Sequence, residues 1–135
     1  MEITAQLSNY RQSPRKVRLV ADAVRGKSAE AALVELNFTL KRTSAPIKKL
    51  LLSALANAEH NNKLSRETLF IKRITVDGGV VLKRGMPRAR GMMEPIKKRT
   101  SHILLVLAEK EAAESKKDKK LGRVAKSKLK NQSEK

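Results

Sequence analysis

One stretch, KRGMPRARGMMEPIKKRTSH at residues 83–102, constrains the fold more than any other part of the chain. Its first seventeen residues carry seven Lys or Arg against a single acid, Glu94. The segments on either side have the composition of β-strands, so the stretch must connect them, yet it is far longer than a turn requires. The chain therefore has a long and strongly basic connection.

Two interpretations of this connection follow from its residues. Prolines cannot donate to a sheet ladder and glycines weaken one, so the tip is not expected to be ordinary paired sheet. The residues concerned are Gly85, Pro87, Gly91 and Pro95. The connection is either a disordered loop or a projecting ribbon, which at about eight or nine residues per side would reach on the order of 25 to 30 Å. A ribbon without a core needs polyanion around it, and folded RNA meets that condition.

The net charge of the chain indicates what kind of molecule it binds. The chain has 31 Lys and Arg against 13 Asp and Glu, a formal net charge of +18, and no cysteine. Such an excess of cations indicates a polyanion, with nucleic acid as the first candidate. No apolar run approaches the ~20 residues of a spanning helix and the N-terminus lacks a signal-peptide pattern, so we expect no membrane partner and a cytoplasmic location. With only three aromatic residues, Tyr10, Phe38 and Phe70, phosphate contact and shape recognition are favoured over base stacking.

Hydrophobic periodicity divides the chain into elements. The pattern predicts a strand near residues 3–7 and helices over SPRKVRLVADAVRGK, AEAALVELNF and PIKKLLLSALANAEHNN. Ser13 and Ser28 are expected N-caps, and Gly26 is an expected left-handed stop. The segments LFIKRITV, VVLKR and SHILLVLAE are strand-like.

The first two of these strand-like segments are joined at Asp77, Gly78 and Gly79. Asp-Gly is a signal for a tight hairpin turn, whereas glycine inside a long strand is typical of a bulge. We favour the bulge, because the strand at 101–109 otherwise lacks a long partner. After it, residues 110–135 hold ten Lys or Arg and few large apolar residues, so we expect a basic, disordered tail.

No catalytic or metal site is apparent in the sequence. His60 and His102 stand outside any catalytic motif, no glycine loop suits phosphate, and the acids do not cluster as metal ligands. We therefore expect neither an enzyme nor a cofactor. The first helix is more informative, because its outer face is rich in arginine, and guanidinium groups suit phosphate and keep their charge when desolvated.

Three segments together resemble a known family, and they are SPRKVRLVADAVRGK, SALANAEHNN and KRGMPRARG with IKKRTSHI. Their order and spacing are similar to those of the large-subunit ribosomal protein numbered twenty-two, in its bacterial form, over about residues 2–109. The resemblance implies an α+β domain at 1–109, with three helices on a small three-stranded antiparallel sheet. It also implies a long protruding β-hairpin at about 80–102, which ends in the basic stretch.

The same resemblance implies a structural, monomeric protein of the large ribosomal subunit. Such a protein binds several domains of 23S rRNA, contacts neighbouring ribosomal proteins, supports subunit assembly and lines the peptide exit tunnel with its hairpin tip, where the nascent peptide passes. The expected RNA-binding residues are Arg11, Arg15, Lys16, Arg18, Arg25, Lys83, Arg84, Arg88, Arg90, Lys97, Lys98, Arg99 and His102. The expected tunnel-lining residues are Met86, Pro87, Arg88, Ala89, Arg90 and Gly91.

Two positions depart from the family pattern, because Met92 and Pro95 stand where relatives commonly carry arginine. We expect the returning strand to pair less regularly there. The alternative function is an architectural DNA-binding protein with proline-tipped basic β-arms. That hypothesis predicts a homodimer, whereas the ribosomal one predicts a monomer.

Overall fold

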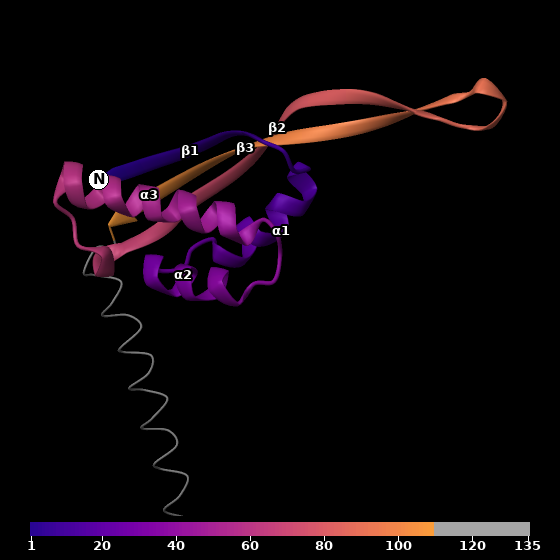
Figure 1. Cartoon of the computed structure of the whole chain (residues 1–135). Coiled ribbons are helices and arrows are strands. Elements are labelled where there is room, and N and C mark those ends of the chain that lie inside the picture. Colours follow the sequence, from indigo (N-terminus) through magenta and orange to yellow (C-terminus); the bar gives the residue numbers. More distant parts are fainter. Residues whose placement is uncertain (110–135) are drawn as a thin grey trace, which may run out of the picture.

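The structure is a computed structural model that describes residues 1–109, and the tail predicted at 110–135 lies outside the described residues. The elements run in the order β1 (Glu2–Tyr10), α1 (Pro14–Val24), α2 (Ala29–Phe38), α3 (Ser44–Asn62), β2 (Leu69–Pro87) and β3 (Met93–Glu109) (Figure 1). Two single 3-10 turns, η1 (Arg66–Thr68) and η2 (Ala89–Gly91), precede the second and third strands.

The three strands form one antiparallel sheet in the order β1-β3-β2. Helix α1 packs mainly against β2, α3 packs against β1, and α2 packs against α3. Strands β2 and β3 continue past the helices as a two-stranded ribbon (Figure 1). The predicted α+β fold, with three helices on a three-stranded sheet and a protruding hairpin, is confirmed.

The core is formed by the alternate side chains of the strands that face the helices and by the apolar stripe along α3. Side chains of β1, β2 and β3 that face the helices are buried, and α3 covers them with one continuous apolar face. The largest buried side chains are Ile47, Leu51, Leu55, Leu69, Ile71, Ile74, Ile103, Leu105 and Leu107. Burial of each such side chain contributes about 1.5–3 kcal/mol, which makes this face the main source of stability.

Strand β2 uses 19 residues to pair with the 17 of β3 because it contains two bulges. At the first bulge, Ile71 opposite Leu107 is followed by Arg73 opposite Val106. The second lies between Gly78, opposite Ser101, and Val81, opposite Arg99. The chain therefore continues through the Asp-Gly segment without turning, and the predicted bulge is confirmed over the tight hairpin.

Pairing of the hairpin extends almost to its end, through Gly85 opposite Pro95 to Pro87 opposite Met93. The expected unpaired tip is thus confirmed for residues 88–92. It is wrong for Gly85, Pro87 and Pro95, which are paired, and the expectation of a less regular returning strand is wrong. Strand β1 pairs with β3 no farther toward the tip than Ser101. At Pro95, β3 therefore has no neighbour on that side, and a strand edge without a neighbour tolerates a proline, which has no backbone N–H. Gly85 leaves room for Met93, whose Sδ would overlap a Cβ at position 85.

The helix ends follow the predicted signals in part. Gly26 has φ +75°, as a left-handed stop requires. The Ser28 Oγ accepts a hydrogen bond from the Ala31 N–H at 3.4 Å and caps α2. Ser13 occupies the N-cap position of α1, but its side chain makes no capping hydrogen bond, and Pro14 at the first helical position has no N–H to offer.

Candidate nucleic-acid interface

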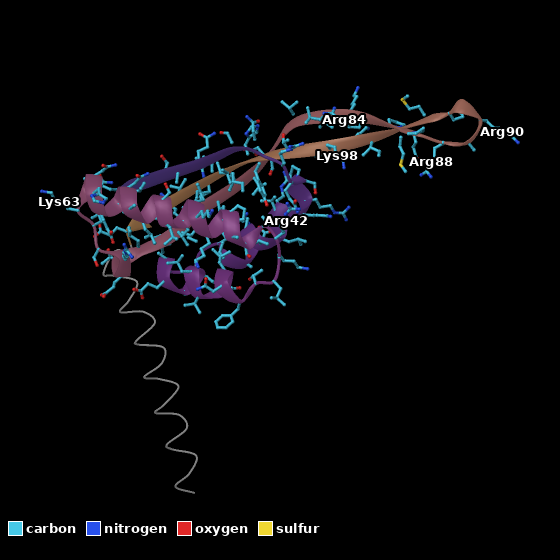
Figure 2. All side chains as sticks on the ribbon, viewed as in Figure 1. Arg42, Lys63, Arg84, Arg88, Arg90 and Lys98 are labelled. Carbon is cyan, nitrogen blue, oxygen red and sulfur yellow. The ribbon has the colours of Figure 1, made fainter. Side chains whose placement is uncertain are left out.

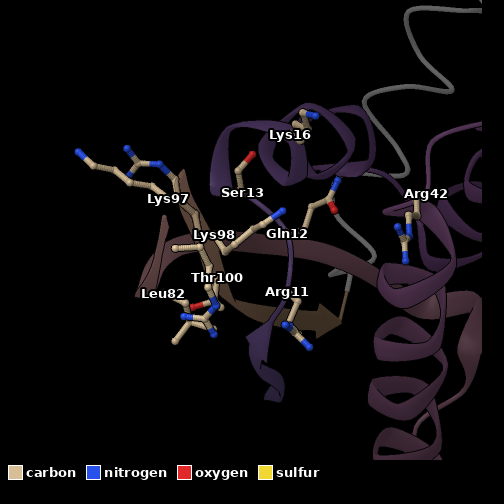
Figure 3. A pocket seen from close by; sticks show the side chains of 11 residues that line it. Arg11, Gln12, Ser13, Lys16, Arg42, Leu82, Lys97, Lys98 and Thr100 are labelled. Carbon is tan, nitrogen blue, oxygen red and sulfur yellow. The ribbon is translucent and has the colours of Figure 1, made fainter. Parts of the chain in front are cut away.

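A basic hollow lies where the hairpin leaves the sheet (Figure 3). It has a volume of about 620 Å³ and is lined by Arg11, Gln12, Ser13, Lys16, Arg42, Leu82, Arg84, Lys97, Lys98, Arg99 and Thr100. Seven of these eleven residues are Lys or Arg and none is acidic. They come from the β1–α1 connection, the start of α1, the turn before α3 and both arms of the hairpin, so only the fold brings them together.

The cations of this hollow are not neutralised by the protein. Among the described residues, none of the seven forms an ion pair with a carboxylate. The hollow also adjoins the N-terminus of α1, whose first backbone N–H groups add partial positive charge. Guanidinium and ammonium groups converging on one concavity suit phosphate groups.

The two arms of the hairpin extend this positive surface. Lys83 lies directly opposite Lys97, and Leu82 lies opposite Lys98. Like charges directly opposite each other in an antiparallel pair are destabilising, so an external anion near Lys83 and Lys97 would relieve the repulsion. Figure 2 shows Arg84 and Lys98 on the hairpin, well short of its tip.

The tip differs from the arms because one of its arginines is paired. The Arg88 Nε donates to Glu94 Oε2 at 2.7 Å, and both side chains remain 58% exposed. The Arg88 backbone N–H donates to the Met92 carbonyl at 2.8 Å and closes the loop. Arg90 has φ 58° and lies at the far end of the hairpin (Figure 2). The tip thus presents Arg90 free of an ion pair within residues 1–109.

Arg18 in α1 and Arg25 directly after this helix contact the sheet instead of projecting freely into solvent. The Arg18 guanidinium donates to the Val76 carbonyl, and the Arg25 Nη2 donates to the Ile74 carbonyl at 3.3 Å. Arg25 also forms an ion pair with Asp22 at 2.9 Å. The sequence could not reveal these contacts, because they join residues that are about fifty or more positions apart.

A second hollow of about 420 Å³ adjoins the first on the α1 side. It is lined by Ser13, Pro14, Arg15, Arg18 and Arg99. Arg99 lines both hollows, so one basic surface runs from the hairpin base along the first turns of α1. We call the two hollows together the junction surface.

The junction surface brings together eight of the predicted RNA-binding residues, which are Arg11, Arg15, Lys16, Arg18, Arg84, Lys97, Lys98 and Arg99. Arg25 lies apart at the end of α1, Lys83 lies on the hairpin arm, and Arg88 and Arg90 lie at the tip.

His102 lies at the hairpin base, where its Nδ1 accepts a hydrogen bond from the Asn9 N–H at 3.2 Å. Because Asn9 belongs to β1, this bond joins β1 to β3, the strand that carries both His102 and Arg99. A Cβ at Gly79 would lie 2.8 Å from the His102 Nε2, so the ring packs against the bulge. The bond gives His102 a structural contact at the point where the hairpin begins.

Sequence reasoning missed Arg42, which joins the first hollow from the turn before α3. The Ser44 hydroxyl and backbone N–H both donate to the Lys41 carbonyl, at 2.7 and 2.9 Å, and fix this turn. The position of Arg42 could have indicated a binding role, because cations just before a helix N-terminus are disfavoured by the helix dipole.

Within the part of the chain that the structure describes, no group of three or more His, Asp or Glu side chains could hold a metal ion. None of the described helices is both long and apolar enough to span a bilayer.

Comparisons with a protein family and with individual proteins point to the same family. A family profile described as "Ribosomal protein L22p/L17e" matches residues 5–108. A protein named "Large ribosomal subunit protein uL22" from Citrifermentans bemidjiense is 54% identical over 110 residues, covering 82% of this chain and 99% of that protein. Proteins of the same name from Geobacter sulfurreducens and Lactobacillus helveticus are 50% and 48% identical, covering 82% and 78% of this chain and 100% and 91% of their own lengths.

Proposed function

We propose, because this chain belongs to the ribosomal protein L22p/L17e family, that it is a structural constituent of the large ribosomal subunit. In this role it binds several domains of 23S rRNA, contacts neighbouring large-subunit proteins and supports assembly of the subunit. Its place is the cytoplasmic ribosome, where it acts as a monomer. No enzymatic activity is assigned, because the family is one of structural proteins.

The observation that carries the proposal is the junction surface, where seven cations converge in the first hollow and none has an ion-pair partner within residues 1–109. Phosphate groups of a folded RNA that enter this hollow would neutralise the cations and release condensed counterions, which drives binding. The bound backbone would also relieve the repulsion between Lys83 and Lys97, which lie opposite each other. RNA binding would thereby stabilise the base of the hairpin as well as anchor it.

The hairpin has two functional parts in this proposal. The arms carry Lys83, Arg84 and the basic run 97–99 and bind rRNA phosphates. The tip residues, which are Met86, Pro87, Arg88, Ala89, Arg90 and Gly91, line the peptide exit tunnel and face the nascent peptide. Support comes from the length of the paired ribbon and from the Arg88–Glu94 ion pair, which leaves the tip with less net charge than the arms.

A binding experiment with a charge-matched control tests the proposal. Affinity is measured for 23S rRNA fragments and for duplex DNA of equal length, using the wild type, Lys97→Gln/Lys98→Gln and Lys48→Gln/Lys49→Gln. Both double variants lose two adjacent lysines, but only the first pair lines the hollow. We expect preference for rRNA and a larger loss of affinity for the first variant.

Three results would contradict the proposal. These are preference for duplex DNA, equal losses in the two double variants, and a homodimer in sedimentation. The last result, together with the first, would support the architectural DNA-binding alternative, which the comparisons do not favour.

A further inference from the structure

The outer face of α2 differs in chemistry from the rest of the surface. Ala31, Val34 and Phe38 project from it at helical spacing, away from the buried Ala32 and Leu36. Phe38 is 80% exposed and Val34 is 54% exposed. Large apolar side chains gathered on one exposed face mark an interaction site more often than isolated ones do. We call this face, with Leu40 just after the helix, the α2 face.

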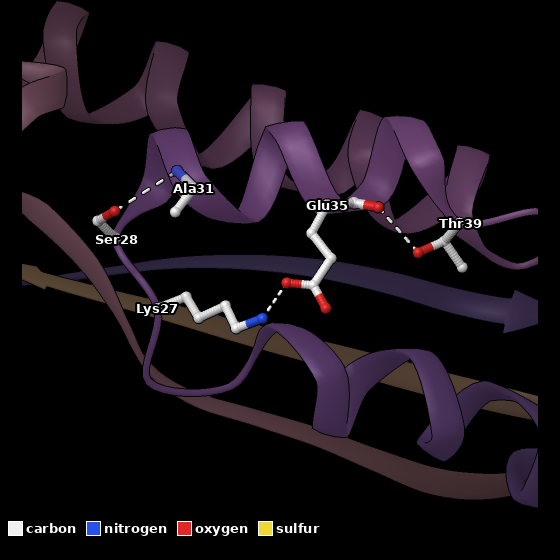
Figure 4. A network of polar contacts seen from close by, with 5 residues as sticks. All are labelled: Lys27, Ser28, Ala31, Glu35 and Thr39. Atoms are coloured by element: carbon white, nitrogen blue, oxygen red, sulfur yellow. Dashed lines mark hydrogen bonds and ion pairs between the residues drawn. The ribbon is translucent and has the colours of Figure 1, made fainter.

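Hydrogen bonds at both ends hold the α2 face rigid (Figure 4). The Ser28 Oγ caps the N-terminus, and the Thr39 hydroxyl donates to the Glu35 carbonyl at 2.8 Å. Lys27 forms an ion pair with Glu35 and ties the helix to the preceding connection. A surface that is already ordered loses little conformational entropy when a partner binds.

Leu40 is fully exposed, yet its backbone is fixed. The single O–H of Ser44 lies within donating distance of two carbonyls, those of Thr39 at 3.0 Å and Lys41 at 2.7 Å, the residues on either side of Leu40. An apolar side chain held out by such a network is presented to a partner rather than exposed by fraying of the helix end.

The charge of the α2 face disfavours phosphate as its partner. In a chain of net charge +18, residues 28–40 contain two acids, Glu30 and Glu35, and no Lys or Arg. Glu35 is engaged by Lys27, whereas Glu30 has no ion pair among the described residues. A base could stack on Phe38, but single-stranded binding also needs cations that hold the backbone, and α2 supplies none.

We infer that the α2 face binds a neighbouring protein of the large subunit, through apolar side chains that cover Phe38 and Leu40 and a Lys or Arg that pairs with Glu30. The inference rests on the proposed place in the large subunit but not on the rRNA contacts of the junction surface. It divides the protein between an RNA-binding side, at the hairpin base, and a protein-binding side, on α2.

Photocrosslinking in assembled subunits tests this assignment. The Phe38→benzoylphenylalanine protein is incorporated into large subunits, which are purified and irradiated. We expect a crosslinked product that survives nuclease, disappears with protease, and contains a large-subunit protein joined through a peptide with apolar residues and a Lys or Arg. The control is Val80→benzoylphenylalanine, which places the probe on the exposed side chain at the hairpin base and should crosslink to rRNA.

The other outcomes overturn the assignment in distinguishable ways. A crosslink from position 38 to rRNA, or none in subunits that contain the protein, overturns the inference alone. Failure of both variants to enter subunits overturns the proposed function and this inference with it.

A second measurement tests the pairing of Glu30. Glu30→Lys should lower the yield of the protein crosslink about tenfold and Glu30→Gln should lower it less, since a like charge repels where an amide only weakens the contact. Unchanged yield in both variants would overturn the pairing.

Discussion

Arg18 on α1 donates from both Nε and Nη2 to the Val76 carbonyl of β2, at 3.1 and 2.9 Å. Strand β2 lies at an edge of the sheet, so its outward carbonyls would otherwise face solvent or another chain. Farther along this edge, the Gly26 N–H donates to the Ile71 carbonyl at 3.1 Å and the Ile71 N–H donates to the Lys27 carbonyl at 2.9 Å. Helix α1 and its connection to α2 therefore cover an edge that could otherwise recruit a strand from another molecule.

This contact predicts different effects for two arginines of the same helix. Arg18→Ala removes two charge-assisted hydrogen bonds to one carbonyl and should lower the free energy of unfolding by about 1.5–3 kcal/mol. Arg15→Ala removes a cation that makes no such bond in the described part of the chain, and it should change this free energy by less than about 0.5 kcal/mol. Denaturant unfolding of the free protein measures both values, and equal values would contradict a structural role for Arg18.

The two adjacent glycines at the second bulge should differ in the same kind of measurement. A Cβ at Gly79 would lie 2.5 Å from the Thr100 Oγ1, whereas a Cβ at Gly78 would meet only the Pro14 Cγ at 4.0 Å. Gly79→Ala should therefore destabilise the fold by about 1–3 kcal/mol through overpacking. Gly78→Ala should be neutral or slightly stabilising, and a larger loss at Gly78 would show that the bulge is packed differently.

Binding to rRNA should weaken steeply as salt rises, because each neutralised phosphate releases counterions. The slope of log affinity against log salt should fall by roughly 0.7–0.9 for each contact that is removed. Lys97→Gln/Lys98→Gln should thus reduce the slope by up to about twice that amount. Filter binding over a salt series measures the slopes, and a flat response of the wild type would refute the electrostatic account.

Deletion of residues 86–88 should leave subunit assembly largely intact. These residues lie at the exposed end of the hairpin, and their loss removes the Arg88–Glu94 ion pair but no core side chain. Because the tip is proposed to line the peptide exit tunnel, in which macrolide antibiotics bind, we expect an altered macrolide response. Sucrose-gradient profiles and growth in a macrolide measure the two effects, with Glu94→Gln as a variant that frees Arg88 without shortening the arm. Absence of the deleted protein from subunits would make the tip structural.

Stability should also depend on pH through Glu59 at the end of α3. The Arg66 side chain, which hydrogen-bonds Glu59, lowers the pKa of this carboxyl below its ordinary value of 4.5. A lowered folded-state pKa stabilises the fold above pH 4.5, and this stabilisation is lost as pH falls through the lower folded value. Glu59→Gln should therefore make the unfolding temperature depend less on pH in the acid range, and an unchanged dependence in this variant would contradict the stabilising role of the pair.

Local patterns predicted most of the fold. The stripe from Ile47 to Ala58 fixed the buried face of α3, and the glycines after Asp77 located the bulge. Pairing beside the tip was predicted wrongly, because the effect of Pro95 depends on whether β3 has a neighbour on its other side. That neighbour, β1, is ninety residues away in the chain, and no local signal reports how far its pairing extends.

The candidate site was predictable in composition but not in arrangement. Arginine on a helix surface and lysine on a strand both indicated phosphate binding, yet only the folded chain separates Arg18, which also contacts β2, from Arg11, which lines the first hollow. Arg42 was missed because it comes from a turn outside the basic stretch.

The continuous pairing of β2 with β3 also limits how the hairpin can change its length. Side chains alternate between the two faces of a strand, so loss of one residue from each arm would keep the strands paired but turn the tip upside down. Loss of two from each arm would keep the tip upright and shorten the reach by roughly 6.6 Å. A change in hairpin length therefore preserves the orientation of the tip only when each arm gains or loses an even number of residues. A change in one arm alone requires a new bulge to keep the strands paired.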